Sequence, residues 1–226
     1  MESFALYSYT ASAISYFLLL GLSLLRIKKS IFGLASVITF PFAVLWSAFT
    51  VYVIQTPGFY IQDIFPIESL RNLAWFFFLS VLISKQQFDN QYYLLKTYKQ
   101  APVVFSVGLC VIALESLPEL RYQVQQIIGF DFRPFVHIFF SLIGLILVEQ
   151  LYRNALQEQR WAIKFLCLGI ASIFIIDFVL YSKSLLFQEL DMLLWEVRGV
   201  VNVLAAPLLA ISLNRLSKEQ VVVQVS

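Results

Sequence analysis

The amino-acid sequence predicts an all-α polytopic membrane protein, a bundle of seven transmembrane helices. Of its 226 residues, 60% are hydrophobic, against about 45–50% in an average soluble protein. Charged residues make up 13%, which is too few to cover the surface of a soluble domain of this size. Seven apolar stretches also follow one another along the chain. Together these observations exclude a soluble globular protein, a disordered chain and a disulfide-rich scaffold.

Each predicted span is an apolar run close to the ~20 residues that a helix needs to cross the hydrocarbon core. No basic residue precedes the first run, and its positive cluster follows at Arg26, Lys28 and Lys29. We therefore expect a retained membrane helix and not a cleaved signal peptide. The third and fourth runs are the shortest. The seven predicted spans are 6–25, 31–55, 67–83, 102–117, 134–152, 161–185 and 194–213.

Basic residues in the connections predict the orientation, because cytoplasmic loops of membrane proteins carry an excess of Lys and Arg. One set of ends holds Arg26, Lys28, Lys29, Lys85, Lys96, Lys99, Arg153, Arg160, Lys164, Arg215 and Lys218. The other set holds only Arg71, Arg121, Arg133, Lys183 and Arg198. The sequence therefore predicts an N-terminus outside and a C-terminus in the cytoplasm.

The connections between spans are short, so we expect no inserted soluble domain. Two predicted outer connections, 56–66 and 118–132, are long enough for one interfacial helix each. The segment 120–128 (LRYQVQQII) has roughly helical spacing of apolar residues and is expected on the outer membrane surface.

Polar side chains gather in the outer halves of several spans, although a charge in hydrocarbon costs about 2.5–3.5 kcal/mol on insertion scales. Three- and four-residue spacing places those of one span on a common face. The residues in question are Glu68, Arg71, Asn72 and Trp75 on the third span, Glu115 on the fourth, His137 on the fifth, Phe174, Asp177, Tyr181 and Ser184 on the sixth, and Trp195, Arg198 and Asn202 on the seventh.

Asp177 and Arg198 form the central candidate pair. They lie at similar depth on consecutive antiparallel helices, with Tyr181 and Asn202 four residues further on. Three interpretations stay open: an ion pair that fixes helix register, a ligand or signal site, or side chains that reach toward the lipid headgroups. His137 is interpreted as an interfacial hydrogen-bonding residue, with a proton switch as the alternative. Together with Arg71 and Glu115, these residues are the candidate sensing cluster.

Signatures of catalysis are missing from the sequence. It contains no HExxH, GxSxG, Walker or GxGxxG motif and no paired intramembrane aspartates. Cys110 and Cys167 lie apart in apolar runs and His137 is the one histidine, so we expect no metal site. The net charge of +2 gives no indication of a nucleic-acid partner. The lipid bilayer is the partner that the composition predicts.

A resemblance to a known family is carried by the last third of the chain. Its motifs are EQLYRN at 149–154, RWAIKFLCLG at 160–169, Asp177-Phe178, Leu180-Tyr181, Leu194-Trp195, RGVVN at 198–202 and Pro207-Leu208. This pattern resembles the N-terminal membrane region of the PrsK family of PEP-CTERM/exosortase-system sensor histidine kinases. Over residues 1–144, mainly the number and spacing of helices agree. The positions that match are Trp161, Lys164, Asp177, Tyr181, Trp195, Arg198, Asn202 and Pro207.

The resemblance implies that residues 1–216 are a transmembrane sensory domain and that 217–226 begin a downstream cytoplasmic segment of a longer protein. The parent would be a two-component histidine kinase of the bacterial inner membrane, controlling exopolysaccharide and PEP-CTERM sorting genes. It would act as a homodimer that passes phosphate to a response regulator. ATP and Mg²⁺ would belong to the missing kinase core, so no cofactor is expected in this chain. The family resemblance thus implies signal transduction without catalysis by these residues.

Two other functions are alternatives to the sensory domain. A small-molecule transporter or channel subunit needs a polar pathway through the whole membrane, yet the inner halves of the predicted helices are almost uncharged. An intramembrane enzyme needs a nucleophile or a metal set, which the sequence lacks. The sequence therefore favours a membrane sensory domain, with a transporter or channel subunit as the alternative.

Overall fold

The computed structural model describes residues 2–25, 31–87, 101–155, 157 and 160–223, and these residues are almost entirely helical. The elements are α1 (Glu2–Leu24), α2 (Ile31–Gln55), the 3₁₀ turn η2 (Ile61–Ile64), α3 (Phe65–Gln87), α4 (Ala101–Ser116), α5 (Pro118–Ile128), α6 (Phe132–Arg153), α7 (Arg160–Phe187) and α8 (Met192–Val223). No strand occurs among the described residues. The prediction of an all-α bundle is confirmed.

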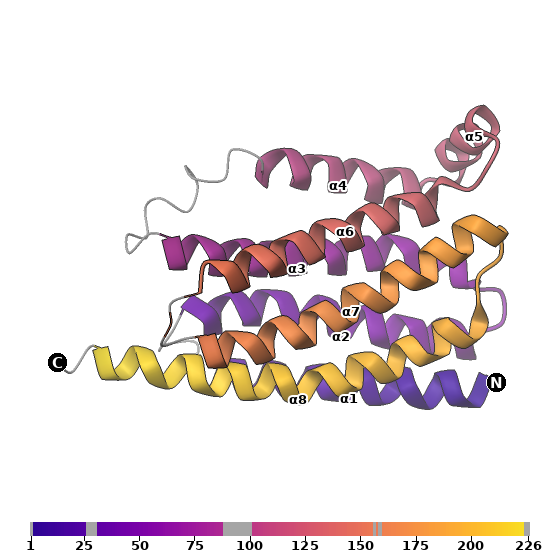
Figure 1. The fold of residues 1–226 in the computed structure, drawn as a ribbon. Coiled ribbons are helices and arrows are strands. Elements are labelled where there is room, and N and C mark those ends of the chain that lie inside the picture. The colour runs from indigo at the N-terminus through magenta and orange to yellow at the C-terminus, as the bar shows by residue number, and fades with distance from the viewer. Residues whose placement is uncertain (1, 26–30, 88–100, 156, 158–159, 224–226) are drawn as a thin grey trace.

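Six helices within the described residues, α1, α2, α3, α6, α7 and α8, are long and apolar enough to cross a membrane. The predicted fourth span is α4, an apolar helix of 16 residues. Because α3 and α6 both begin at the same end of the bundle, α4 carries the chain back between them (Figure 1). Within the described residues, α4 thus runs along the bundle beside the six longer helices, and α1 begins at the end opposite to the one where α8 finishes (Figure 1). This is a polytopic membrane protein; which end faces the cytoplasm stays a prediction.

Six helices form a closed ring. Each neighbour in the order α1, α2, α3, α6, α7, α8 packs against the next, and α8 packs against α1. α4 lies on the outside of this ring against α3, and α5 extends from it at one end (Figure 1). The ring brings α3 beside α6 and α8 beside α1, contacts between segments that are far apart in the sequence.

The predicted last span, 194–213, corresponds to an apolar stretch at Met192–Leu216, and α8 itself continues beyond it to Val223. The boundary between a membrane domain at 1–216 and a downstream segment from 217 stays a prediction. The 56–66 connection, long enough for an interfacial helix, holds one 3₁₀ turn, η2. Lys85 belongs to α3, while Arg26, Lys28, Lys29, Lys96 and Lys99 lie outside the described residues.

The surface helix predicted at 120–128 is present as α5, and none of its residues is buried. Pro118 occupies its first turn, where a missing N–H costs nothing. Gly129 ends it with φ +84°, a left-handed conformation that suits glycine. Asp131 then caps α6 by accepting a hydrogen bond from the backbone N–H of Arg133. Position and amphipathic spacing fit a helix lying at the membrane surface.

Candidate functional site

The buried polar residues of five helices meet inside the bundle, in the half that contains the start of α3. We call this set the polar cluster; every member is at most 3% exposed. Its members are Glu68, Ser69 and Arg71 from α3, Glu115 from α4, His137 from α6, Asp177 and Tyr181 from α7, and Arg198 and Asn202 from α8. Helical spacing explains how each helix contributes, because residues three or four apart share one face.

Asp177 is bound by two arginines. Its Oδ2 accepts a hydrogen bond of 2.5 Å from Arg71 Nη2, and its Oδ1 accepts one of 2.6 Å from Arg198 Nε. The predicted Asp177–Arg198 contact is therefore confirmed. The contact to Arg71 was not predicted, and it makes Asp177 the acceptor that links α3, α7 and α8.

Glu68 is the second acceptor in the cluster. Its Oε1 accepts hydrogen bonds from Arg198 Nη2 and, at 2.6 Å, from the Tyr181 hydroxyl. Arg71 Nη2 lies 3.9 Å from the same oxygen. Two carboxylates and two guanidinium groups thus alternate, and each charge has opposite charges beside it. Such pairing is what makes buried ions tolerable in a low-dielectric interior.

His137 lies between two further carboxylate contacts. Its Nε2 is 3.2 Å from Glu115 Oε1, and its Nδ1 is 3.5 Å from Glu68 Oε1, an ion-pair distance without hydrogen-bond alignment. Ser69 donates to Glu115 Oε2 at 2.7 Å. His137 is interpreted from the sequence as an interfacial hydrogen-bonding residue; its side chain is completely buried in the bundle and contacts Glu115, and its depth in the membrane stays a prediction. These contacts attach the end of α4 to α3 and α6.

The first two helices complete the surroundings of the cluster. Tyr16 of α1 donates a hydrogen bond of 2.6 Å to Asn202 Oδ1, and Asn202 Nδ2 donates to the Arg198 carbonyl. Trp46 of α2 lies under both guanidinium groups, with its ring centroid 4.0 Å from Arg71 Cζ and 4.9 Å from Arg198 Cζ. Cation–π contact of this kind stabilises a desolvated arginine. All six helices of the ring therefore touch the cluster.

The charges of the cluster are nearly balanced. Three carboxylates, those of Glu68, Glu115 and Asp177, face two guanidinium groups and one imidazole. Buried donors on Arg71 (Nε and Nη1), Trp46 and Trp75 have no hydrogen-bond partner among the described residues. No group of His, Cys, Asp and Glu suitable for a metal ion occurs in the described part of the chain. The arrangement is suited to holding helices by charge, and a change of one charge would disturb several of them.

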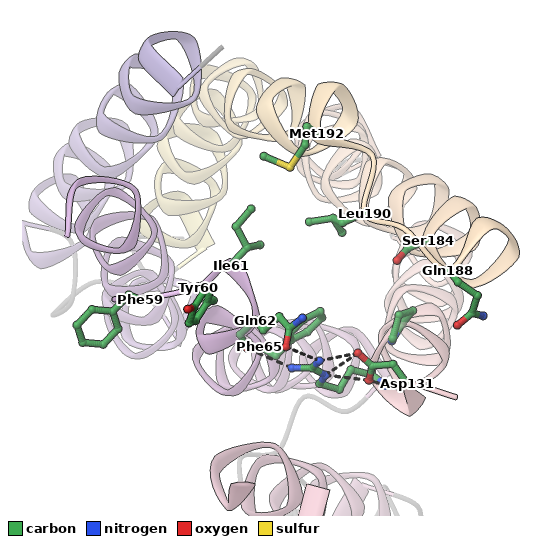
Figure 2. Close-up of a pocket in the computed structure, with 12 residues that line it drawn as sticks. Phe59, Tyr60, Ile61, Gln62, Phe65, Asp131, Ser184, Gln188, Leu190 and Met192 are labelled. Carbon is green, nitrogen blue, oxygen red and sulfur yellow. Dashed lines mark hydrogen bonds and ion pairs between the residues drawn. The ribbon is translucent and has the colours of Figure 1, made fainter. Parts of the chain in front are cut away.

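A pocket of about 430 Å³ opens at the same end of the bundle (Figure 2). Its walls come from the η2 segment and from the adjoining ends of α6, α7 and α8. The lining residues are Phe59, Tyr60, Ile61, Gln62, Phe65, Asp131, Arg133, Pro134, Ser184, Gln188, Leu190 and Met192. We refer to this end as the pocket end.

Together with Ile61 and Leu190, Phe65 lies between the pocket and the polar cluster. It lines the pocket and also a second cavity of about 10 Å³, which is lined by Glu68 and Tyr181 of the cluster. The Phe65 ring centroid is 4.7 Å from Arg133 Cζ and 5.0 Å from the His137 ring centroid. The Phe65 ring therefore contacts both Arg133 of the pocket and His137 of the cluster.

The one acidic residue of the pocket lining is held ionised. Partial burial tends to raise the pKa of Asp131, but hydrogen bonds from the Arg133 side chain and backbone outweigh that effect, so the pKa lies below its ordinary value. Arg133 Nε lies 2.9 and 3.0 Å from the two carboxylate oxygens of Asp131. The pair closes one wall of the pocket.

The residues that carried the family resemblance are spread over the whole length of α7 and α8. Trp195 is buried near the cluster, and its carbonyl accepts a hydrogen bond of 2.8 Å from Tyr9. Trp161 and Lys164 are exposed at the opposite end, where Arg215 lies over the Trp161 ring. Pro207 is exposed on α8. Trp161, Lys164 and Pro207 thus lie outside the polar cluster.

Several members of the site were not among the predicted site residues. Glu68 is named in the sequence analysis on the polar face of the third span but is not assigned to the candidate cluster, although a glutamate on an apolar helix face needs a partner. Ser69, Tyr16 and Trp46 carried no such signal, because serine and aromatic residues are common in membrane helices. The pocket lining was missed because it is assembled from three chain segments that meet only in the fold.

Comparison with known proteins found no match at any level: no family model, curated protein or solved structure is similar to this chain.

Proposed function

We propose that this chain is the membrane-embedded sensory domain of a signalling protein, with the pocket as its input and the polar cluster as its switch. The resemblance of residues 145–215 to PrsK-type kinases supports a bacterial sensor histidine kinase as the parent. On that proposal, autophosphorylation, ATP, Mg²⁺, dimerisation and the response regulator belong to the parent, in the inner membrane. This chain itself would bind and transmit without catalysis.

The observation that carries the proposal is the placement of the pocket over the polar cluster. A molecule that enters the pocket reaches Phe65, which packs on His137, which in turn contacts Glu68 and Glu115. Because Glu68 is bound to Arg198 of α8, a shift of Phe65 changes the contacts of the helix that reaches the opposite end. A charged network of this kind has discrete arrangements between which a ligand can select.

A transporter or channel would use the same pocket but needs a continued polar path. Among the described residues, the buried charged side chains all lie in the pocket-end half. In the opposite half, buried hydroxyls such as those of Ser23, Ser36 and Ser212 bond to backbone carbonyls. This difference favours the sensory function over transport.

The test is whether substitution of a residue in the polar cluster changes the distance between helices at the opposite end of the bundle. Spin labels on cysteines at Ile146 of α6 and Ile211 of α8, both exposed in that half, report helix separation after Cys110 and Cys167 are replaced by alanine. We expect Asp177→Asn, and the matched Glu68→Gln, to shift the distance distribution by about 1–2 Å, the size of typical helix shifts in signalling proteins. Ser212→Ala is the control and should leave the distribution unchanged.

Two outcomes contradict the proposal. Folded Asp177→Asn and Glu68→Gln variants with the wild-type distance distribution would show that the cluster does not communicate with the opposite end. Sodium, potassium or proton flux through reconstituted liposomes, abolished by Asp177→Asn, would instead establish the transport alternative.

A further inference from the structure

The pocket has a distinct chemical character, because its charged groups are already paired with each other. Asp131 receives hydrogen bonds from Arg133 Nε and, at 2.5 Å, from Arg133 Nη2. Gln62 occupies the remaining side of the guanidinium, with its Oε1 3.1 Å from Arg133 Nη2. Arg133 is also only 2% exposed. Neither an anion nor a cation finds an uncompensated opposite charge in this lining.

The other lining residues are apolar or carry uncharged hydrogen-bonding groups. Figure 2 shows Ser184 and Gln188 on one side of the opening and Phe59, Tyr60 and Ile61 on the other. The pocket is thus polar but uncharged toward α7 and aromatic toward η2. An amphiphilic molecule has the same two-sided character.

The size and position of the pocket fit such a molecule. About 430 Å³ lies at the lower end of the ~300–1,000 Å³ typical of small-molecule sites. Phe59 and Tyr60 are 42% and 71% exposed at the pocket end, and aromatic residues of this kind mark the boundary between membrane and water. A ligand that partitions into this boundary is concentrated at the mouth of the pocket.

We propose that the pocket binds an uncharged amphiphile, whose hydrogen-bonding head faces Ser184 and Gln188 and whose apolar body packs on Phe59, Tyr60 and Ile61. This proposal specifies the ligand class for the proposed sensory function. The interpretation of the pocket as an input site rests on that function. Phe65 is then the residue through which the bound molecule presses on His137.

The test measures protection of a cysteine in the pocket lining. Met192→Cys is labelled by a maleimide in lipid nanodiscs, in the background without Cys110 and Cys167. The matched control is Leu193→Cys, its neighbour, which is exposed but does not line the pocket. Three probes carry the same ten-carbon chain: monodecanoylglycerol is uncharged, decanoate is anionic and decyltrimethylammonium is cationic.

We expect monodecanoylglycerol at ten times its dissociation constant to slow labelling of Met192→Cys about tenfold, because only the unoccupied fraction reacts. Labelling of Leu193→Cys should change less than about twofold on the same mass-action scale. The charged probes should protect neither site. Ser184→Ala should weaken protection by the uncharged probe.

Equal or better protection by a charged probe would overturn the uncharged class, and equal protection of both cysteines would overturn the site. The Ile146–Ile211 distance distinguishes a failure of the ligand assignment from a failure of the sensory function. If monodecanoylglycerol protects Met192→Cys but leaves that distance unchanged, the pocket assignment stands and the sensory function fails. If no probe protects while Asp177→Asn shifts the distance, the sensory function stands and the ligand assignment fails.

Discussion

The two halves of this bundle are held together by different forces. In the pocket-end half, hydrogen-bonded charges from α3, α7 and α8 converge on Asp177 and Glu68. In the opposite half, apolar side chains such as Leu79, Ile163 and Leu209 are completely buried, and hydroxyls bond to backbone carbonyls. Apolar contact is non-directional and tolerates small shifts, whereas charged contacts depend on geometry and on every partner. We therefore expect the pocket-end half to rearrange when one charged contact changes, and the opposite half to hold the helices together.

The largest expected effect concerns which side of the membrane each half faces, because labelling from one side is all or none. In a background without native cysteines, Tyr60→Cys at the pocket end should react with a membrane-impermeant maleimide in intact bacterial cells. Arg153→Cys, equally exposed at the end of α6, should react only after permeabilisation. The expectation follows from the excess of basic residues on the Arg153 side. The reverse pattern would invert the orientation and place the pocket in the cytoplasm.

The next largest effect is the loss of one charge from the cluster. Asp177→Asn removes the carboxylate that binds both Arg71 and Arg198 and leaves Glu68 as the carboxylate they share. We expect it to lower the free energy of unfolding by about 3–5 kcal/mol. Arg198→Gln should be similar or smaller, because Arg71 still binds Asp177. Unfolding in detergent measures both variants.

The double variant Asp177→Asn/Arg198→Gln is the matched control for that prediction. It leaves Arg71 and Glu68, whose charges are opposite and 3.9 Å apart. Its loss should therefore be well below the sum of the single losses. Additive losses of unfolding free energy would show that the two side chains do not interact. The pocket-end half would then not be held together by coupled charges.

A smaller effect is expected where α4 joins the ring. His137→Leu removes the imidazole beside Glu115 and leaves that buried carboxylate with Ser69 alone, a loss of about 1–3 kcal/mol. We expect faster hydrogen exchange in α4 and α5, with the ring helices less affected. Ser141→Ala on the same helix is the control, since its hydroxyl bonds only its own turn. Unchanged exchange in α4 would show that packing on α3 alone holds this helix.

Much of the fold was predictable because hydropathy and charge report contact with lipid directly. Hydropathy locates the membrane span of α8 but not the end of the helix, because polar residues such as Asn214 and Arg215 end the apolar run while the helix continues. Hydropathy measures what a residue touches, while helix continuity depends on backbone hydrogen bonds. The 3₁₀ turn at Ile61–Ile64 was missed for a related reason, since loop length permits a helix without requiring it.

The candidate site was predictable only in part. Asp177 and Arg198 lie on consecutive antiparallel helices, which are usually neighbours, so their contact followed from the sequence. The contact of Glu68 with Arg198 joins residues 130 positions apart and depends on how the ring closes. No periodicity in a single sequence states that α3 and α8 approach each other across the bundle.

The smallest expected effect belongs to the opposite half. Ser212 donates a hydrogen bond of 2.8 Å to the Ala162 carbonyl and so joins α8 to α7. Hydrogen bonds between membrane helices are worth about 0.6 kcal/mol on average, and Ala162 keeps its helical bond when the hydroxyl is removed. We therefore expect Ser212→Ala to lower the free energy of unfolding by roughly that amount.

Tyr16→Phe is the matched variant at the polar cluster, because it also removes a single hydroxyl that joins two helices. Its partner, Asn202 Oδ1, accepts no backbone hydrogen bond within the described part of the chain. The expected loss is therefore about 1–3 kcal/mol. Both variants are measured by the same unfolding assay in detergent. Equal losses would mean that a hydroxyl contributes the same wherever it lies, and the contrast between the halves would then rest on charge alone. A larger loss of unfolding free energy for Tyr16→Phe would show that uncharged residues in contact with the polar cluster also depend on exact geometry.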